Sequence, residues 1–273
     1  MITASIVIYN SAKKDLQTVV NCAANSMINT IYIVDNAPND ELKEFVKNLS
    51  EKIIYIQGQG NIGYGAAHNL AIEQAIQQNA KYHFILNPDI EFSKDVIEKL
   101  TIFMEEQSNV GLVMPKVFYP DGNIQYLCKL LPTPFDLIFR RFLFFLPGKN
   151  KRKEKYELRN LDYSKIHFDI PSLSGCFMMF RIDVLKQIGG FDERFFMYME
   201  DVDLCRRVHD VAQTAFFPFV SIIHHYEKGS YKSFKLLKYH ICSAFKYFNK
   251  WGWFFDREKL KINKKMLPLQ NLN

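Results

Sequence analysis

The stretch IIYIQGQGNIGYGAAHNLAI, residues 53–72, places a glycine-rich loop between an apolar run typical of a strand and a periodic run typical of a helix. Glycine adopts backbone conformations that other residues avoid, so either a ligand approaches this loop or the chain turns tightly onto its helix. Gly58-x-Gly60-x-x-Gly63 also matches a dinucleotide fingerprint, which requires an acid about 20 residues further on. Here two strand-like runs come first, and the next strand-ending acid, Asp89, lies in an Asn-Pro-Asp turn. The sequence therefore argues against a dinucleotide site.

Strands and helices are expected to alternate on both sides of this loop. Short apolar runs rich in β-branched and aromatic residues predict strands at 4–9, 30–35, 52–57 and 82–87. Apolar residues three and four apart predict helices at 13–25, 39–50 and 66–79. This alternation predicts an α/β fold with a mostly parallel central sheet, helices on both faces, and ligands beyond the carboxyl ends of the strands.

Composition excludes several classes of protein. The chain has 273 residues, 48% of them hydrophobic, which suits one large α/β domain or two small ones. Its five cysteines are scattered without a CxxC pair, so we expect neither a disulfide framework nor a cysteine metal site, and a reducing cytosol fits best. No leader pattern and no apolar run of roughly 20 residues is evident, so an integral membrane protein is not expected.

Positive charge is concentrated near the end of the chain. Eleven Lys and Arg stand against two acids between Lys228 and Lys265, a local excess of +9 in a chain of net charge +6. A second basic patch at 149–159 follows an aromatic run at 135–148. Nucleic acid is one partner for such patches, but interleaved aromatic residues without an RNA-binding signature suit an anionic membrane surface at least as well, and a solvated basic face is the alternative.

The segment after residue 232 has the pattern of a basic amphipathic helix. Its apolar residues lie at 234, 237, 241, 245 and 248, with lysines between them and with Trp251 and Trp253 beyond. Such a helix either contacts a membrane or packs on the domain that precedes it.

Four motifs in a fixed order resemble a known family. VDNAP (34–38), NIGYGAAHN (61–69), LNPDI (86–90) and GGFDERFFMYMEDVDLCRRV (189–208) are similar to the inverting family 2 glycosyltransferases of GT-A fold, in the rhamnosyltransferase-like branch of polysaccharide biosynthesis. The resemblance covers roughly residues 3–230. It implies a GT-A (nucleotide-diphospho-sugar transferase) domain at 1–230 with a nucleotide-sugar half at about 1–120. It further implies an acceptor half at about 165–230, a basic aromatic insert at about 132–160, and a separate amphipathic helical segment at 231–273.

The resemblance also implies an activity. A metal-dependent hexosyltransferase would move rhamnose or another hexose from a nucleoside diphosphate sugar to a hydroxyl of a saccharide or lipid-linked acceptor. It would be cytoplasmic and, with a lipid-linked acceptor, peripheral on the inner face of the cell membrane. A nucleotidyltransferase, which should carry a basic glycine-rich loop where this chain reads YNSAKKD, and a non-catalytic nucleotide-sugar-binding protein are the alternatives.

For the donor, the resemblance implies that Asp35 contacts the base or ribose, whereas from the residues alone Asp35 could be a turn residue. Gly63 and Gly65 would let the backbone approach the nucleotide, while Asn61 and Asn69 fix the loop or meet the ribose. His68 would be a surface helix residue or a ligand. The full set expected at the donor is Tyr9, Asn10, Asp35, Asn36, Asn61, Gly63, Gly65, Asn69, Asn87, Gly175 and Glu200.

The metal site is expected at Asn87-Pro88-Asp89, where Asn87 replaces the first carboxylate of the family's DxD element. Asp89 would bind Mg²⁺ or Mn²⁺ together with the donor phosphates, since these cations prefer oxygen ligands. A plain strand-ending turn is the alternative. Of the paired histidines that end a later strand, His225 is preferred over His224 as the residue facing the diphosphate or metal.

The resemblance assigns Asp201 as the general base that takes a proton from the acceptor hydroxyl. Glu200, Asp201 and Asp203 would repel one another, so we expect a raised pKa or a cationic partner such as Arg206 or Arg207. Asp203 would be a structural or acceptor-orienting carboxylate. An acidic helix start without catalytic role is the alternative.

Overall fold

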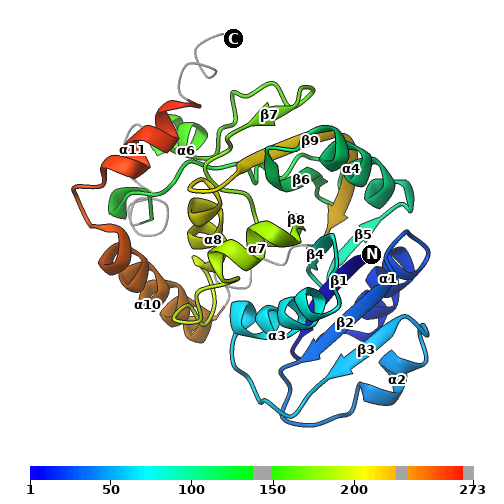
Figure 1. Ribbon diagram of the computed structural model, residues 1–273. Coiled ribbons are helices and arrows are strands. Elements are labelled where there is room, and N and C mark those ends of the chain that lie inside the picture. The colour runs from blue at the N-terminus through cyan, green and yellow to red at the C-terminus, as the bar shows by residue number, and fades with distance from the viewer. Residues whose placement is uncertain (138–148, 226–232, 267–273) are drawn as a thin grey trace.

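The computed structural model describes residues 1–137, 149–225 and 233–266, and in them a mixed sheet of nine strands forms the centre of the molecule (Figure 1). The strand order is β3-β2-β1-β4-β8-β6-β9-β5, with β7 paired to β9. The strands are β1 (Ile2–Ile8), β2 (Thr30–Asp35), β3 (Ile53–Ile56), β4 (Tyr82–Leu86), β5 (Ile90–Phe92), β6 (Val110–Phe118), β7 (His167–Phe168), β8 (Phe177–Arg181) and β9 (Gln213–His224). The helices are α1 (Lys13–Ala24), α2 (Lys43–Lys47), α3 (Tyr64–Gln77), α4 (Asp95–Glu106), α6 (Lys149–Tyr156), α7 (Ile182–Ile188), α8 (Glu200–Val208), α10 (Phe234–Trp251) and α11 (Arg257–Lys264).

The first four strands of the sheet are parallel, as the alternation predicts. Strand β1 pairs in parallel with both β2 and β4, and β2 pairs in parallel with β3. Ile8 stands opposite Asp35 in this register, so the carboxyl ends of β1 and β2 lie side by side. Beyond β4 the sheet is mixed, because β8 is antiparallel to both of its neighbours, β4 and β6.

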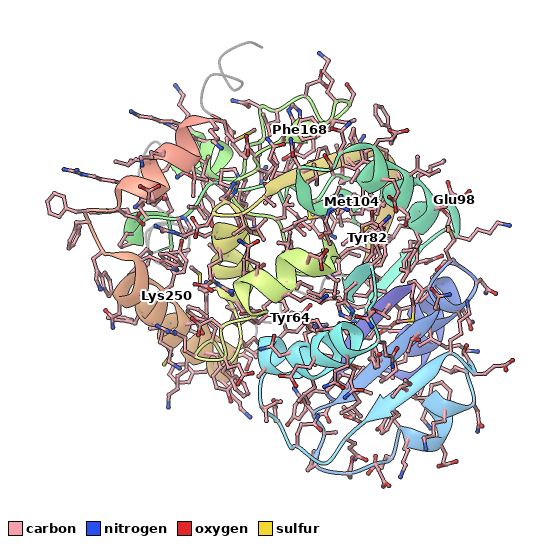
Figure 2. All side chains as sticks on the ribbon, viewed as in Figure 1. Tyr64, Tyr82, Glu98, Met104, Phe168 and Lys250 are labelled. Atoms are coloured by element: carbon pink, nitrogen blue, oxygen red, sulfur yellow. The ribbon has the colours of Figure 1, made fainter. Side chains whose placement is uncertain are left out.

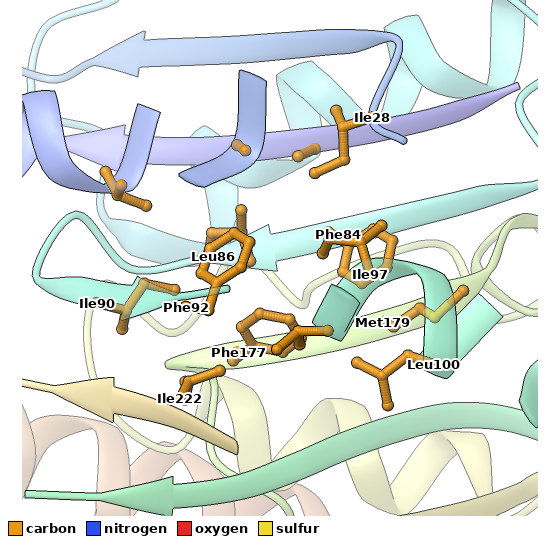
Figure 3. Close-up of a cluster of buried hydrophobic side chains, with 14 of the residues drawn as sticks. Ile28, Phe84, Leu86, Ile90, Phe92, Ile97, Leu100, Phe177, Met179 and Ile222 are labelled. Atoms are coloured by element: carbon orange, nitrogen blue, oxygen red, sulfur yellow. The ribbon is translucent and has the colours of Figure 1, made fainter. Parts of the chain in front are cut away.

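Helices cover both faces of the sheet, and each face has its own hydrophobic core. On one face α1 and α4 pack on the strands, and Phe177 of β8 makes edge-to-face ring contacts with Phe84 and Phe92 (Figure 3). On the other face α3, α7 and α8 pack on the strands through side chains such as Ala71 and Leu204. The expected α/β fold with helices on both faces is therefore confirmed.

The C-terminal helices pack on the body of the protein. A third core cluster joins Tyr247 and Phe248 of α10 and Ile262 of α11 to Phe195 and Val202. Figure 1 shows α10 and α11 along the outer edge of the molecule beside α8, on the side opposite α2 and β3. Among the helices of the described ranges, none combines the length and apolar character required to cross a bilayer. The expected aromatic run at 135–148 lies mostly outside the described residues.

Candidate active site

Tyr64, the first residue of α3, connects two strand ends. Its hydroxyl lies 2.7 Å from the carbonyl oxygen of Gly175 and 3.0 Å from Oδ1 of Asn87. With one proton, the hydroxyl donates to one of these oxygens at a time. Figure 2 shows Tyr64 where α3 meets the segment that leads into α8. The residue thus lies between the Asn-Pro-Asp turn and the acidic cluster.

Asp201 is held at this junction by backbone amides. Its Oδ2 accepts a hydrogen bond of 3.1 Å from the amide of Gly175, and its Oδ1 accepts one of 2.8 Å from Val202. A Cβ added at Gly175 would lie 3.4 Å from the Cβ of Asp201, in tight contact. The carboxylate also lies in the first turn of α8, where the helix dipole favours negative charge. Gly175 therefore packs directly against the expected base.

The backbone that leads into α8 has an unusual conformation. Tyr198 and Met199 have φ angles of 68° and 70°, in the left-handed region that residues with a side chain rarely adopt. Two such residues in succession cost free energy, and strain of this kind concentrates at functional sites. Here it sets the direction in which α8 begins, and with it the position of Asp201.

The repulsion among the three acids is relieved in two ways, both of them anticipated from the sequence. Burial, and then the charge of Asp201, raises the pKa of the Glu200 carboxyl well above its usual range. Asp203 is fully buried and accepts hydrogen bonds from Arg207, Lys250 and Trp251 at 2.6–2.8 Å. Asp203 is therefore a structural residue that fixes α8 to α10.

Asp89 lies beside His224 at the turn after β4. Its Oδ1 is 3.4 Å from Nε2 of His224, and Nε2 is also 3.4 Å from Nδ2 of Asn87. Burial raises the pKa of Asp89, but its contacts with His224 outweigh this and hold it below the usual range. Burial has the opposite effect on His224 and lowers its pKa, but the nearby Cys176 and Asp89 side chains raise this pKa to about 10. The pair is charged at neutral pH.

Gln125 fixes the orientation of His224. Its Nε2 donates to the carbonyl oxygens of His224 at 2.7 Å and Phe118 at 3.3 Å, which directs its Oε1 toward Nδ1 of His224 at 3.0 Å. Because an amide oxygen only accepts hydrogen bonds, Nδ1 carries a proton and Nε2 faces Asp89. Such a partner orients histidines in many metal sites.

His225 does not face this cluster. Its side chain is directed to Glu91, with Nε2 3.8 Å from a carboxylate oxygen, and is 44% exposed. Adjacent residues of a strand point to opposite faces, so only one of the two histidines can face Asp89. The structure places His224 there, whereas the sequence pattern had favoured His225.

The turn can contribute to a metal site but does not build one alone. Oδ1 of Asp89 is buried, and apart from its 3.4 Å ion-pair contact with Nε2 of His224 it forms no hydrogen bond within the described residues, so it can serve a ligand. Within the described ranges, no group of three or more His, Cys, Asp or Glu is arranged to hold a metal ion. The residues present thus fit a divalent cation that takes most of its ligands from a bound phosphate.

Asp35 and Asn36 connect the end of β2 to the glycine loop. The Asp35 carboxylate is 1% exposed, accepts a 2.8 Å hydrogen bond from the amide of Ala37, and accepts another from the Tyr55 hydroxyl. Nδ2 of Asn36 donates to the carbonyl oxygen of Gly63 at 3.0 Å. The turn role of Asp35 is realised, and its carbonyl oxygen accepts a 2.8 Å hydrogen bond from the Gln59 side chain of the glycine loop.

Gly63 is required by its surroundings. Its φ is 95°, and a Cβ there would lie 2.4 Å from the carbonyl oxygen of Phe196. That oxygen accepts a 2.9 Å hydrogen bond from the backbone amide of Tyr64. The loop before α3 therefore touches the loop before α8 backbone to backbone. Gly65 is also required by packing, since a Cβ there would lie 2.9 Å from Phe191.

The asparagines of the motif hold loops. Oδ1 of Asn61 accepts from the Gly63 amide at 3.2 Å. Asn69 is buried and exchanges two hydrogen bonds with the backbone of Phe191, at 2.8 and 2.9 Å. Of the two roles open to Asn61 and Asn69, the structure shows loop fixation. Tyr9, 45% exposed, and Asn10, with φ 53°, follow β1 at the same edge of the sheet as Asp35.

Of the two roles expected for His68, a surface helix residue or a ligand, the structure contradicts the first. His68 is fully buried, with Nδ1 2.7 Å from Oγ of Ser5, which also lies 2.8 Å from Nε2 of His83. Its ring contacts Tyr64 edge-on at 4.5 Å. His68 therefore supports Tyr64 from the core.

Sequence reasoning missed Tyr64 and Gln125. An aromatic residue between two glycines at a helix start, as in Gly63-Tyr64-Gly65, could have drawn attention to Tyr64. Gln125 lies in an irregular segment between β6 and α6 with no motif around it, so nothing in the sequence pointed to it.

Comparisons with known proteins bear on the family and the fold of the chain. The model of "Glycosyl transferase family 2" matches residues 3–189, and that of "N-terminal domain of galactosyltransferase" matches residues 158–235. The low-salt glycan biosynthesis hexosyltransferase Agl10 of Haloferax volcanii is 30% identical over 178 residues, covering 64% of this chain and 52% of that protein. The N-acetylglucosaminyl-diphospho-decaprenol L-rhamnosyltransferase of Mycobacterium tuberculosis is 25% identical, covering 72% of this chain and 66% of that protein.

The chain thus spans between half and two thirds of the length of these two relatives. Among solved structures, the mannosyltransferase PcManGT from Pyrobaculum calidifontis, in complex with GDP-Man and Mn²⁺, superposes with a TM-score of 0.59 at 15% identity. That match covers 98% of this chain and 72% of PcManGT, and it establishes a shared GT-A fold. Because the family model covers more than half of its residues, the chain belongs to glycosyl transferase family 2.

Proposed function

We propose that this protein is an inverting, metal-dependent hexosyltransferase that moves a sugar from a nucleoside diphosphate sugar to a hydroxyl of a saccharide or lipid-linked acceptor. One observation carries the proposal. Tyr64 and Gly175 connect the Asn-Pro-Asp turn, which suits a diphosphate with its cation, to Asp201, which suits a general base. Inversion by direct displacement needs these two functions on opposite sides of one anomeric carbon.

In this scheme the nucleotide lies along the carboxyl ends of β1 and β2. Asp35, Asn36, Tyr9 and Asn10 line the base and ribose, and Gly63 lets the loop before α3 approach them. The diphosphate lies at Asp89, whose buried Oδ1 beside His224 would hold Mg²⁺ or Mn²⁺ together with the phosphate oxygens. When bound, the cation supplies Lewis acidity that stabilises negative charge on the leaving diphosphate.

His224 has two conceivable roles beside Asp89. As the cation implied by its raised pKa, it orients Asp89 and adds positive charge near the leaving group. As a metal ligand it would first have to lose the proton on Nε2, since only neutral imidazole binds a metal. Gln125 favours the same ring orientation in both cases.

Asp201 takes the proton of the acceptor hydroxyl while that oxygen attacks the anomeric carbon. The amides of Gly175 and Val202 stabilise the ionised carboxylate and hold it in place. A positioned base contributes roughly 10²–10⁴ in rate. Burial, and then the charge of Asp201, raises the pKa of Glu200, which favours its neutral form and lessens the negative charge next to the base.

Homology suggests the acceptor. The Mycobacterium tuberculosis relative is named for a diphospho-decaprenol acceptor, a sugar carried on a polyprenyl lipid. We infer an acceptor of the same class for this chain, which would place the reaction at the inner surface of a membrane with the protein in peripheral contact.

A ligand panel tests the proposal. Thermal shifts with UDP-, dTDP- and GDP-sugars, each with and without Mn²⁺, should reveal one donor whose stabilisation depends on the cation, because selective ligand binding raises apparent stability. The same donor should then be hydrolysed slowly, as measured by release of the nucleoside diphosphate. Binding without turnover would favour a non-catalytic protein, and release of pyrophosphate from a nucleoside triphosphate with a sugar phosphate would favour a nucleotidyltransferase.

A further inference from the structure

The two faces of α10 differ sharply. On the inner face Tyr247 and Phe248 are buried, Ser243 donates to the Met197 carbonyl at 2.8 Å, and Lys246 donates to the Arg194 carbonyl at 2.7 Å. On the outer face Phe234, Ile241 and Phe245 are exposed, at helical spacings of seven and four residues. The apolar residues of this helix therefore form two stripes, only one of which packs on the protein.

The turn after α10 continues the exposed stripe. Phe254 is 75% exposed and Phe255 is 97% exposed, and both lie between α10 and α11. The ring of Trp253 contacts that of Phe245 at 5.1 Å, which ties this turn to the outer face of the helix. Side chains this exposed project from the surface, so they suit a flat, deformable surface better than a binding pocket on another protein.

Positive charge accompanies these aromatic residues. Lys235 and Lys238 are exposed on α10 next to Phe234, and neither forms an ion pair within the ranges that the structure describes. No acid occurs in α10. Aromatic residues that enter the interfacial layer, flanked by lysines that contact phosphate headgroups, are the combination that binds anionic membranes.

We propose that the outer face formed by Phe234, Lys235, Lys238, Ile241, Phe245, Phe254 and Phe255, the docking face, binds the surface of an anionic membrane. The proposal rests on the proposed function only for its purpose, which is to bring a lipid-linked acceptor to the enzyme. The attraction itself follows from exposure and charge.

Ring contacts join α10, which carries most of the docking face, to the segment that leads to the candidate base. Tyr239 and His240 of α10 contact the rings of Phe196 and Tyr198 at 4.6 and 5.1 Å. Those residues belong to the segment that enters α8, and the Phe196 carbonyl accepts the hydrogen bond from Tyr64. A membrane bound at the docking face would thus lie one helix away from the segment that carries Asp201.

Vesicle flotation tests the docking face. The full chain should float with vesicles containing about one third anionic lipid, and much less with neutral vesicles or at high salt. The double variant Phe254→Ser/Phe255→Ser should bind anionic vesicles roughly tenfold more weakly, and Lys235→Glu/Lys238→Glu should show a similar loss. Phe219→Ser, which alters a residue that is 62% exposed on β9, is the matched control and should float like the wild type.

Two further measurements separate the possible outcomes. Thermal melting should be unchanged in all these variants, and release of nucleoside diphosphate without vesicles should match the wild type, so a defect in catalysis is distinguishable from a defect in docking. Equal flotation with neutral and anionic vesicles would overturn the proposal. So would light scattering that shows a dimer broken by Phe254→Ser/Phe255→Ser while flotation is unchanged, because the face would then pair with a second copy of the chain.

Discussion

The backbone amide of Gly175 donates a hydrogen bond to the carboxylate of Asp201 at 3.1 Å. The next residue, Cys176, accepts a hydrogen bond from the backbone amide of Asn87 through its carbonyl oxygen. Adjacent residues of one segment therefore position the candidate base and the Asn-Pro-Asp turn. The two halves of the site are therefore fixed to each other by backbone, which tolerates little displacement.

Replacement of Asp201 by Asn should abolish turnover and preserve donor binding. Asparagine is almost isosteric and can still accept from the Gly175 amide through its side-chain oxygen, but it cannot take up a proton. We expect kcat to fall by roughly 10²–10⁴, with a thermal shift by the donor equal to that of the wild type. Asp183→Asn, an exposed acid in the first turn of α7, is the control. Undiminished turnover of the Asp201 variant would refute the assigned base.

Tyr64→Phe should lower the catalytic rate with little effect on the stability of the fold. The variant loses the hydroxyl near Gly175 and Asn87 but keeps the ring contact with His68. We expect kcat to fall roughly ten- to hundredfold, because small misplacements of reacting groups are costly. The melting temperature should change by only a few degrees. Tyr82→Phe, at the amino end of β4, removes a hydroxyl far from the site and should leave kcat unchanged.

Gly63→Ala should destabilise the protein more than Gly58→Ala. Both glycines have φ near 100°, so both variants pay the same kind of backbone cost. Only at Gly63 does the new Cβ collide, 2.4 Å from the Phe196 carbonyl, whereas no atom lies within 4 Å at Gly58. Urea unfolding should show an additional loss of about 1–3 kcal/mol for Gly63→Ala. Equal losses in the two variants would mean that the two loops do not touch in solution.

The two buried histidines should destabilise the folded protein in mild acid. Burial lowers the pKa of His83 to about 3, and lowers that of His68 well below its usual value. Both are neutral when folded and take up protons when unfolded, so the stability present above a pH of about 6.5 is lost as pH falls toward 3. His83 alone should remove about 2 kcal/mol of unfolding free energy between pH 7 and pH 5.

Urea titrations at the two pH values measure this loss, and His83→Gln should lessen it. The comparison with His83→Gln is decisive, because Glu200 and His224, whose pKa values are raised in the folded protein, add stability as pH falls and offset part of the loss. An equal change in unfolding free energy between pH 7 and pH 5 in the wild type and in His83→Gln would show that His83 is not neutral in the folded protein.

Breaking the Arg206–Asp256 pair should loosen the C-terminal helices. The two side chains are each 4% exposed and form two hydrogen bonds, at 2.6 and 2.7 Å. Asp256→Asn can still cap α11 but leaves Arg206 charged and buried, a cost of about 3–5 kcal/mol. The exposed pair Lys261–Glu258 provides the control, since Glu258→Gln should change stability by less than about 0.5 kcal/mol. Limited proteolysis after α10 should accelerate only in the first variant.

Residues at strand ends were predictable from sequence. Parallel strands end at one edge of the sheet, so Asp35, Asn87 and Asp89 could be grouped from the alternation alone, without a structure. The direction of β8 could not be inferred, because a short apolar strand carries no signal for its orientation. The mixed half of the sheet could therefore not be predicted from the sequence pattern.

The histidine pair shows why side-chain direction was harder. Simple alternation along β9 is broken where Pro115 pairs with Phe217 and Lys116 pairs with Ser221, an irregularity around Pro218. Counting residues along the strand then no longer tells which histidine faces Asp89. His68 was misjudged for another reason: its partner Ser5 comes from β1, and long-range pairs between small polar residues leave no local pattern.

The antiparallel insertion of β8 has a consequence for biosynthesis. Strand β4 pairs with β1 on one side, but its other edge is completed only when Phe177–Arg181 is made, and 90 residues lie between Leu86 and Phe177. At translation rates of about 5–20 residues per second, that edge stays open for roughly 5–18 s on the ribosome. Tyr82–Leu86 is entirely buried in the finished sheet, so in that interval the nascent chain exposes an unpaired apolar strand edge that is prone to aggregation. Because β8 closes this edge before β9 is made, protection by chaperones is most valuable midway through synthesis.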